Sequence, residues 1–166
     1  SDTLGAFELM QAMRMHFLAQ DVECRFVLAP IRLDSPLNPA RAWNMMGAGF
    51  SEARERLNDK ADVSAYRFSF PAEPLIEASL EAHGYTLTYV EHLWTPTQRR
   101  YLIHFLTRGG HTMAQVAAEL DVSSRNLYNV LRSAHRELYM RQCDTIREVL
   151  AALDARNEGA AGVVGA

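Results

Sequence analysis

The sequence lacks the features that mark membrane proteins and disulfide-bonded secreted proteins. Its two cysteines, Cys24 and Cys143, lie far apart, which argues against a disulfide framework and fits a reducing cytoplasm. No apolar run approaches the roughly 20 residues of a membrane-spanning helix, and the sequence shows no signal peptide. We therefore expect a cytoplasmic protein that makes no contact with a membrane.

Motifs for metal binding and catalysis are absent as well. The six histidines are scattered, and no pair has metal-ligand spacing beside a carboxylate or thiolate cluster. The sequence contains neither a G-x-S-x-G nucleophile elbow nor a Walker loop. We therefore predict no metal site, no cofactor and no catalytic residues, and expect a protein that is not an enzyme.

An excess of positive charge over the whole chain is also missing, since the net charge is −3. Any binding of nucleic acid must therefore depend on a local basic patch. One segment, Ser124 to Arg141, has such a composition, with four arginines against a single glutamate. These charged residues are Arg125, Arg132, Arg136, Arg141 and Glu137.

The same region has the apolar spacing of a helix-turn-helix. Between Thr112 and Leu131, two short apolar stripes at helical spacing flank a tight corner at Asp121-Val122-Ser123. The stripes consist of Val116, Ala117 and Leu120 in the first helix and Leu127, Val130 and Leu131 in the second.

The residues around the corner suit their expected backbone positions. Asp121 is one of the few types other than glycine that tolerates the left-handed conformation required there. Ser123 or Ser124 can cap the second helix. The helix before the helix-turn-helix is expected to have Thr95 as its N-cap and Pro96 as its first residue.

The second helix would present hydrogen-bonding side chains to a DNA groove. We predict that Thr112, Gln115 and Arg136 contact phosphates, while others read base edges. The base-reading residues are expected to be Arg125, Asn126, Asn129 and Arg132, and Ser123, Ser124 and Tyr128 complete the predicted interface. The alternative is an ordinary helical hairpin whose second helix has a solvated polar face.

The run from Trp94 to Ser123, WTPTQRRYLIHFLTRGGHTMAQVAAELDVS, resembles the C-terminal helix-turn-helix of sigma-factor region 4, LuxR-type regulators and the SatD family. The resemblance implies contact with double-stranded DNA in transcription. It also implies that the helix from Ser124 to about Arg136 enters the major groove.

The N-terminal part shows helical and alternating patterns in turn, which predicts an α+β fold: a small partial sheet covered by helices, followed by an all-α helix-turn-helix domain. Helices are expected at Gly5–Gln20, Ala40–Leu57 and Glu73–Leu93, strands at Val22–Leu28 and Ser64–Phe70, and a loop at Pro30–Pro39.

Several single residues refine this pattern. Asp21 should end the first helix, and Gly84 should interrupt the helix that starts at Glu73. Gly47 and Gly49 indicate a bend or a late start in the second helix. In the second strand, Arg67 should face outward while the aromatic side chains face inward.

Two strands rarely form a stable sheet. We therefore expect either strands from a partner chain or a domain that continues upstream of Ser1. Ser1-Asp2-Thr3 and the run GAGFSEARERL from Gly47 to Leu57 resemble segments of SatD-type N-terminal domains, which are similar to nucleotidyl cyclases. The resemblance implies a degenerate cyclase-like sheet, with Asp2 as one metal-binding carboxylate and Ser51 in place of an asparagine.

Neither glycine nor proline occurs between His111 and Glu158, so the helix after the corner either runs on or breaks near Met140. Apolar residues from Leu138 to Leu153 form one face, which either packs on the sheet or pairs with a second copy. The predicted segments are an α+β domain at 1–72, a connector helix at 73–93, the helix-turn-helix domain at 94–157 and a frayed tail at 158–166.

The sequence thus predicts a sequence-specific double-stranded DNA-binding regulator of transcription that acts as a homodimer. Two other functions remain open. The basic helices of a protein-interaction module would contact transcription machinery such as RNA polymerase. A catalytically inactive cyclase-like sensor would bind an effector on the N-terminal sheet.

Overall fold

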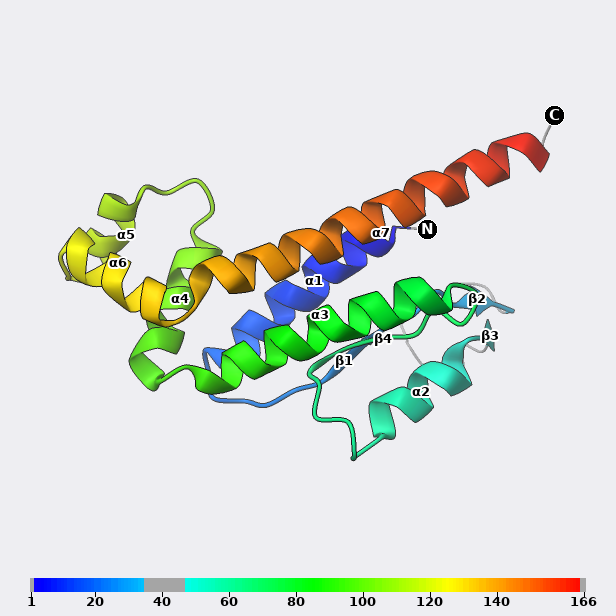
Figure 1. Ribbon diagram of the computed structural model, residues 1–166, viewed down its shortest axis with the longest axis horizontal. Helices are drawn as coiled ribbons and strands as arrows, with labels where there is room; N and C mark the ends of the chain where they lie inside the picture. The colour runs from blue at the N-terminus through cyan, green and yellow to red at the C-terminus, as the bar shows by residue number, and fades with distance from the viewer. Residues whose placement is uncertain (1, 35–46, 165–166) are drawn as a thin grey trace.

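The computed structural model describes residues 2–34 and 47–164 and confirms the predicted α+β class (Figure 1). Helices dominate, and the strands are short. The elements are α1 (Thr3–Leu18), β1 (Phe26–Leu28), β2 (Arg32–Leu33), β3 (Gly47–Ala48), α2 (Phe50–Asn58), β4 (Tyr66–Phe68), α3 (Pro74–Leu93), α4 (Pro96–Thr107), α5 (Met113–Glu119), α6 (Ser124–Ser133) and α7 (Arg136–Val164). None of the helices in these ranges combines the length and hydropathy needed to span a membrane.

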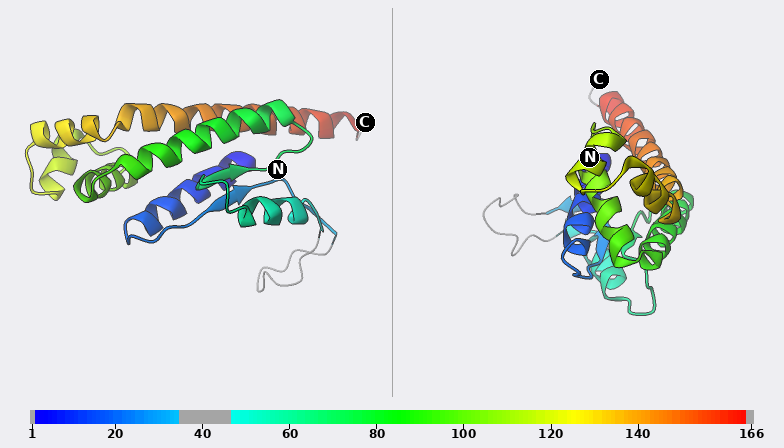
Figure 2. Two further views of the ribbon diagram at one scale, coloured as in Figure 1. Left: turned by 60° about the horizontal axis from the view of Figure 1, so that its bottom comes forward. Right: turned by 90° about the vertical axis from the view of Figure 1, so that its left-hand side faces the viewer.

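The sheet consists of two separate strand pairs. β1 and β4 are parallel, with Val27 opposite Arg67, whereas β2 and β3 form a small antiparallel pair. In Figure 2, α2 lies on one side of the parallel pair and the long helices α3 and α7 run side by side on the other. The predicted strands were too long, because only three residues of each form the parallel ladder.

Side chains of α3 cover the open edge of β4, so the edge offers no free pairing site for a partner strand. Glu81 accepts a hydrogen bond from the Phe68 amide at 2.6 Å, and Glu77 accepts one from the Phe70 amide at 2.5 Å. Bonding to these outward amides removes the need for a further strand on that side. The edge of β4 is therefore no pairing site for a second copy, whereas pairing at the edge of β1 stays a prediction.

Arg67 is buried, although the alternating pattern predicted that it faces outward. Its guanidinium donates hydrogen bonds to the carbonyls of Ser64, Asp59 and Arg56, and it forms an ion pair with Asp62 at 3.1 Å. Because α2 and the segment after it lie over this face of β4, both faces of the strand are buried. The carbonyls and the carboxylate compensate the charge that burial would otherwise leave unsatisfied.

Helix α3 continues through Gly84, so the predicted interruption is wrong. A β-carbon on Gly84 would lie 2.5 Å from the carbonyl oxygen of Tyr66. The missing side chain therefore lets α3 approach β4 closely. The helix also exposes an apolar side chain, Leu75, with 86% of its surface accessible.

The second predicted helix starts late, as Gly47 and Gly49 indicated. Gly49, at φ 98°, is the N-cap of α2, and the two residues before it form β3. The expected helical stretch at 40–46 and the second half of the predicted loop, residues 35–39, lie outside the described residues. At the other end of the chain, the α7 backbone stays helical to Val164, where the sequence predicted a frayed tail.

A buried polar cluster lies in the middle of the core, between α1, α3, β4 and α7. Glu91 accepts hydrogen bonds from the hydroxyls of Tyr66 and Tyr139 at 2.6 and 3.0 Å, and it pairs with Arg14 at 2.9 Å. Burial raises the pKa of Glu91 above its usual value, and the Arg14 guanidinium offsets only part of this rise. Burial likewise raises the pKa of both tyrosine hydroxyls, so they remain donors.

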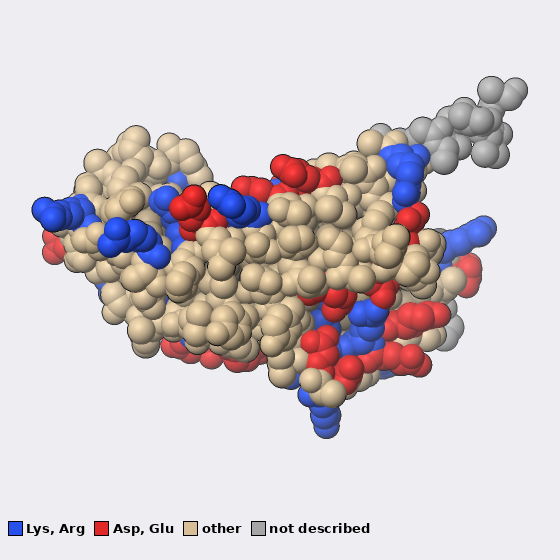
Figure 3. Space-filling view, viewed as in Figure 1, with Lys and Arg blue, Asp and Glu red and all other residues tan. Residues whose placement is uncertain are grey.

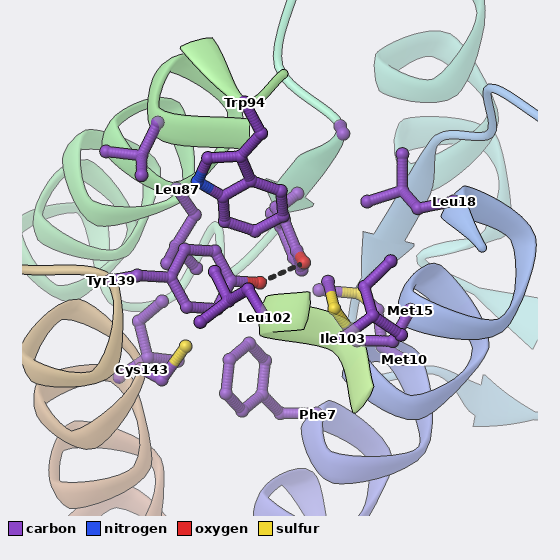
Figure 4. Close-up of a cluster of buried hydrophobic side chains, with 14 of the residues drawn as sticks. Phe7, Met10, Met15, Leu18, Leu87, Trp94, Leu102, Ile103, Tyr139 and Cys143 are labelled. Atoms are coloured by element: carbon purple, nitrogen blue, oxygen red, sulfur yellow. Dashed lines mark hydrogen bonds between the residues drawn. The ribbon is translucent and has the colours of Figure 1, made fainter. Parts of the chain in front are cut away.

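Apolar side chains surround this cluster (Figure 4). The face of α7 that carries Cys143, Ile146, Leu150 and Leu153 is buried there, against α1 and α3. Of the two alternatives for this face, packing within the chain is therefore correct, although the partners are helices rather than the sheet. Leu138, at the start of the predicted face, is exposed, so the fold covers only the part from Cys143 to Leu153.

Three helix ends depend on a non-glycine residue in the left-handed conformation. Asp21, at φ 56°, follows α1, as predicted. Asp121, at φ 54°, lies between α5 and α6, which confirms the corner expected from the sequence. His135, at φ 56°, separates α6 from α7, so the chain breaks there and not near Met140.

Substitution of Asp121 tests the corner. Asp121→Gly should be neutral or stabilising, because relief of strain of about 1 kcal/mol opposes the entropy that glycine loses on folding. Asp121→Val should be clearly destabilising, since a β-branched side chain fits this conformation worst. Urea denaturation midpoints of the two variants measure the difference, and equal midpoints would contradict the left-handed geometry.

Substitution of Gly84 tests the contact between α3 and β4. Within an exposed helix, Gly→Ala stabilises by about 0.4–1 kcal/mol. Gly84→Ala should instead destabilise by about 1–3 kcal/mol, because its methyl group overlaps the Tyr66 carbonyl. Ala151→Gly, at an exposed position of α7, measures the effect of helix propensity alone and is the control. A stabilised Gly84→Ala protein would show that the two elements can separate without cost.

Candidate nucleic-acid interface

Capping boxes fix the helices that lead to the corner. Thr95 and Gln98 form one at the start of α4, and Thr112 and Gln115 form another at the start of α5. In the second box, the Thr112 hydroxyl accepts a hydrogen bond from the backbone amide of Gln115 at 3.3 Å. The side-chain oxygen of Gln115 accepts one from the backbone amide of Thr112 at 2.8 Å. The Thr95 cap and the helical start at Pro96 are thus as predicted.

The corner packs α6 closely across α5. Val116 and Ala117 of α5 are buried, as are Leu127 and Leu131 of α6. The small Ala117 side chain leaves room for this crossing. The backbone carbonyl of Ala117 accepts a hydrogen bond from the Val122 amide at 3.0 Å. This is the compact bihelical unit that the apolar spacing predicted.

The cap of α6 is Ser123, whose hydroxyl accepts a hydrogen bond from the Asn126 amide at 3.1 Å. Ser124 is therefore the first helical residue and not the cap. The predicted contact residues of α6 are all exposed. These residues are Ser124, Arg125, Asn126, Tyr128, Asn129 and Arg132.

The arginines of this surface differ from the three buried or half-buried arginines that hold the N-terminal part together. Among the residues that the structure describes, Arg125 and Arg132 form no ion pair, whereas Arg14, Arg56 and Arg67 each bind a carboxylate. The Arg132 guanidinium lies 5.9 Å from the centre of the Tyr128 ring instead. Figure 3 shows positive side chains at the α5–α6 end of the molecule.

A basic cleft of about 390 Å³ continues this surface from α6 to α7. Arg136 begins α7, and its guanidinium lies 5.1 Å from the Phe105 ring centre, which holds the side chain beside the cleft. Sequence reasoning missed His135 and placed Arg141 only within a charge count. Both line the cleft because the left-handed His135 turns the chain there. The cleft is lined by Tyr128, Arg132, His135, Arg136, Glu137, Leu138 and Arg141.

A second charged cluster, also missed in the sequence, ties α5 to α4. The Glu119 carboxylate interacts with His104 at 2.7 Å, with Arg108 at 3.0 Å and with His111 at 3.0 Å. The hydrogen bond with His104, together with the charges of Arg108 and His111, holds the pKa of Glu119 below its usual value. The cluster therefore closes the turn at Gly109-Gly110 and orients α5 on α4.

The features implied by a cyclase-like site are not assembled. Asp2 caps α1, since its carboxylate accepts a hydrogen bond from the Gly5 amide at 2.8 Å. Ser51 is exposed on α2. Within residues 2–34 and 47–164, the acidic, histidine and cysteine side chains form no group suited to a metal ion. A cleft of about 550 Å³ does lie beyond the carboxyl ends of β1 and β4, lined in part by Pro30, Phe70 and Leu153.

Of the ten predicted contact residues, α6 and the loop before it present seven on one surface, and Arg136 adjoins them across the cleft. Thr112 and Gln115 lie at the start of α5, where the Thr112 hydroxyl and the side-chain oxygen of Gln115 both take part in capping the helix. Comparison with known proteins adds nothing to this geometry: no family model, no curated protein and no solved structure matches the chain.

Proposed function

We propose that the protein is a sequence-specific double-stranded DNA-binding regulator of transcription, with α6 as the recognition helix in the major groove. The observation that carries this proposal is the exposed face of α6. There, Arg125 and Arg132 stand without a carboxylate partner among the described residues, beside amide side chains that suit base edges. The resemblance to SatD-type and sigma-type helix-turn-helix units points the same way.

We assign different tasks to the basic residues. Arg125, Asn126 and Asn129 lie on the first two turns of α6, the part of a recognition helix that meets base edges. Arg132 and Arg136, at the basic cleft, are placed for phosphates, as is the amide nitrogen of Gln115. Arg132 therefore moves from the predicted base-reading set to the phosphate-binding set.

A protein-interaction module that contacts RNA polymerase through the same helices is the competing proposal. Protein interfaces favour aromatic anchors and apolar surface at their centre. The α6 face instead offers serine, asparagine and arginine, with Tyr128 as its only aromatic residue. This composition suits a hydrated, polar DNA groove better.

Alanine substitutions in α6 test the proposal. After selection of a preferred duplex from a random pool, Arg125→Ala should weaken binding by about 1–3 kcal/mol and relax the preference at one base. Arg136→Ala should weaken binding to all sequences alike and reduce the salt slope by about 1, because it removes a phosphate contact. Fluorescence anisotropy over a salt series measures both effects.

Arg54→Ala is the matched control, since Arg54 is an exposed arginine on α2, remote from α6. It removes the same charge and should leave affinity and salt slope nearly unchanged. Wild-type affinity in both Arg125→Ala and Arg136→Ala, with circular dichroism unchanged, would exclude α6 and its cleft from DNA binding.

The cleft beyond β1 and β4 favours a second candidate function, effector sensing. Small molecules bind preferentially at the carboxyl ends of parallel strands, and this cleft also contacts α7 through Leu153. A nucleotide or another small effector that binds there should raise the thermal midpoint with increasing concentration. Leu153→Trp should abolish the increase by filling the cleft, and an unchanged midpoint over a nucleotide panel would speak against a nucleotide sensor.

A further inference from the structure

The outward side of α3 forms a continuous strip without charge. Eight positions of the helix are exposed, and none is Asp, Glu, Lys or Arg, although these types make up 22% of the chain. Six of the eight follow one another along one side of the helix. We define the α3 strip as Leu75, Ala78, Ala82, Tyr85, Tyr89 and His92.

The glutamates of α3 are absent from the strip because they are engaged elsewhere. Glu77 and Glu81 accept hydrogen bonds from amides of the β4 segment and pair with Arg56 of α2. Glu91 is buried with Arg14. The chain thus directs every acidic side chain of this helix inward, and only uncharged side chains remain on its outer side.

The spacing of the α3 strip alternates between three and four residues over its whole length. This spacing is that of the seam through which two helices pair in a coiled coil. Ala78 and Ala82 permit close approach of a second helix, while Tyr85 and Tyr89 supply apolar area with hydroxyls at the rim. The pattern therefore fits another helix better than an extended strand.

The exposed area is larger than isolated surface residues would give. Leu75, Tyr85 and Tyr89 are 86%, 55% and 57% exposed, and the neighbouring Leu93 is 49% exposed. Figure 3 shows the uncharged surface that α3 and the adjacent part of α7 form toward the viewer. A contiguous uncharged surface of this kind marks an interaction site.

We propose that the α3 strip pairs with the α3 strip of a second copy, with the two helices parallel. In a parallel two-fold pair, each side chain near the axis faces its own copy, so any charge there would oppose an identical charge. A strip without charges meets this condition along its full length. A different partner would not require it, because opposite charges could then be matched across the interface.

The place of the strip in the fold also favours a second copy. It ends at His92, beside Trp94, whose indole nitrogen donates to the carbonyl of Ala134 at the end of α6 at 2.9 Å. Parallel pairing therefore brings both helix-turn-helix units to the same end of the dimer. Operators are commonly read by two such units on adjacent half-sites. The advantage of this placement rests on the proposed function.

The area sets the expected strength of the dimer. The strip and Leu93 together can bury on the order of 500 Å² per copy, or about 1,000 Å² in total, the lower limit for a specific interface. We therefore expect a dimer that dissociates on dilution and that a two-half-site duplex stabilises.

Sedimentation velocity of the purified full chain over a dilution series tests the pairing. The wild type should shift from monomer to dimer mass as concentration rises. A double variant, Tyr85→Glu with Tyr89→Glu, should stay monomeric, because each carboxylate would face its own copy. Leu9→Glu, at a 62%-exposed leucine of α1, is the matched control and should dimerise like the wild type. A monomeric wild type, or an unaffected double variant, would overturn the proposal.

A disulfide test remains valid even if the double variant fails to fold. In a Cys24→Ser background, Ala82→Cys should form a covalent dimer rapidly under mild oxidation, whereas Leu9→Cys should not. Equal rates for the two variants would overturn the parallel register. Failure of DNA binding with intact dimerisation would remove the proposed function alone, whereas DNA binding by a chain that never pairs would remove this inference alone.

Discussion

The contacts of a single buried carboxylate join most of the structure. Glu91 of α3 binds Arg14 from α1, Tyr66 from β4 and Tyr139 from α7 inside an apolar core. A buried ion pair adds little stability over apolar residues of the same volume, but loss of one partner costs about 3–5 kcal/mol because a charge remains uncompensated. The cluster therefore works mainly as a constraint, since the three groups that bind Glu91 come from three different elements and must meet at one carboxylate.

This constraint extends to the proposed DNA-binding surface. The ring of Tyr139 lies 5.1 Å from that of Trp94, and the Trp94 indole binds the end of α6 through the Ala134 carbonyl. Tyr139 also follows His135 by one helical turn, on the helix that begins with Arg136 of the basic cleft. Helix α6 is thus fixed to the N-terminal core by both the chain before it and the chain after it.

Sequence alone predicted those parts of the structure that depend on neighbouring residues. The corner at Asp121, a serine cap of α6 at Ser123 or Ser124, and the start of α4 follow from backbone preferences and local hydrogen bonds. The burial of Arg67 and the close contact at Gly84 could not be predicted, because both depend on elements far away in the chain. The cleft was missed for a related reason, since no residue type marks His135 in advance as a left-handed helix end.

The same distinction explains why the sequence could not show whether the apolar face of α7 was free to pair. The pattern of α7 shows an apolar face but not what covers it, and in the fold α1 and α3 cover Cys143 to Leu153. The edge of β4, the other expected surface, is bonded by Glu77 and Glu81. Because these glutamates turn toward β4, the outer side of α3 is left without charge. The interaction that closes the sheet is therefore also the one that creates the α3 strip.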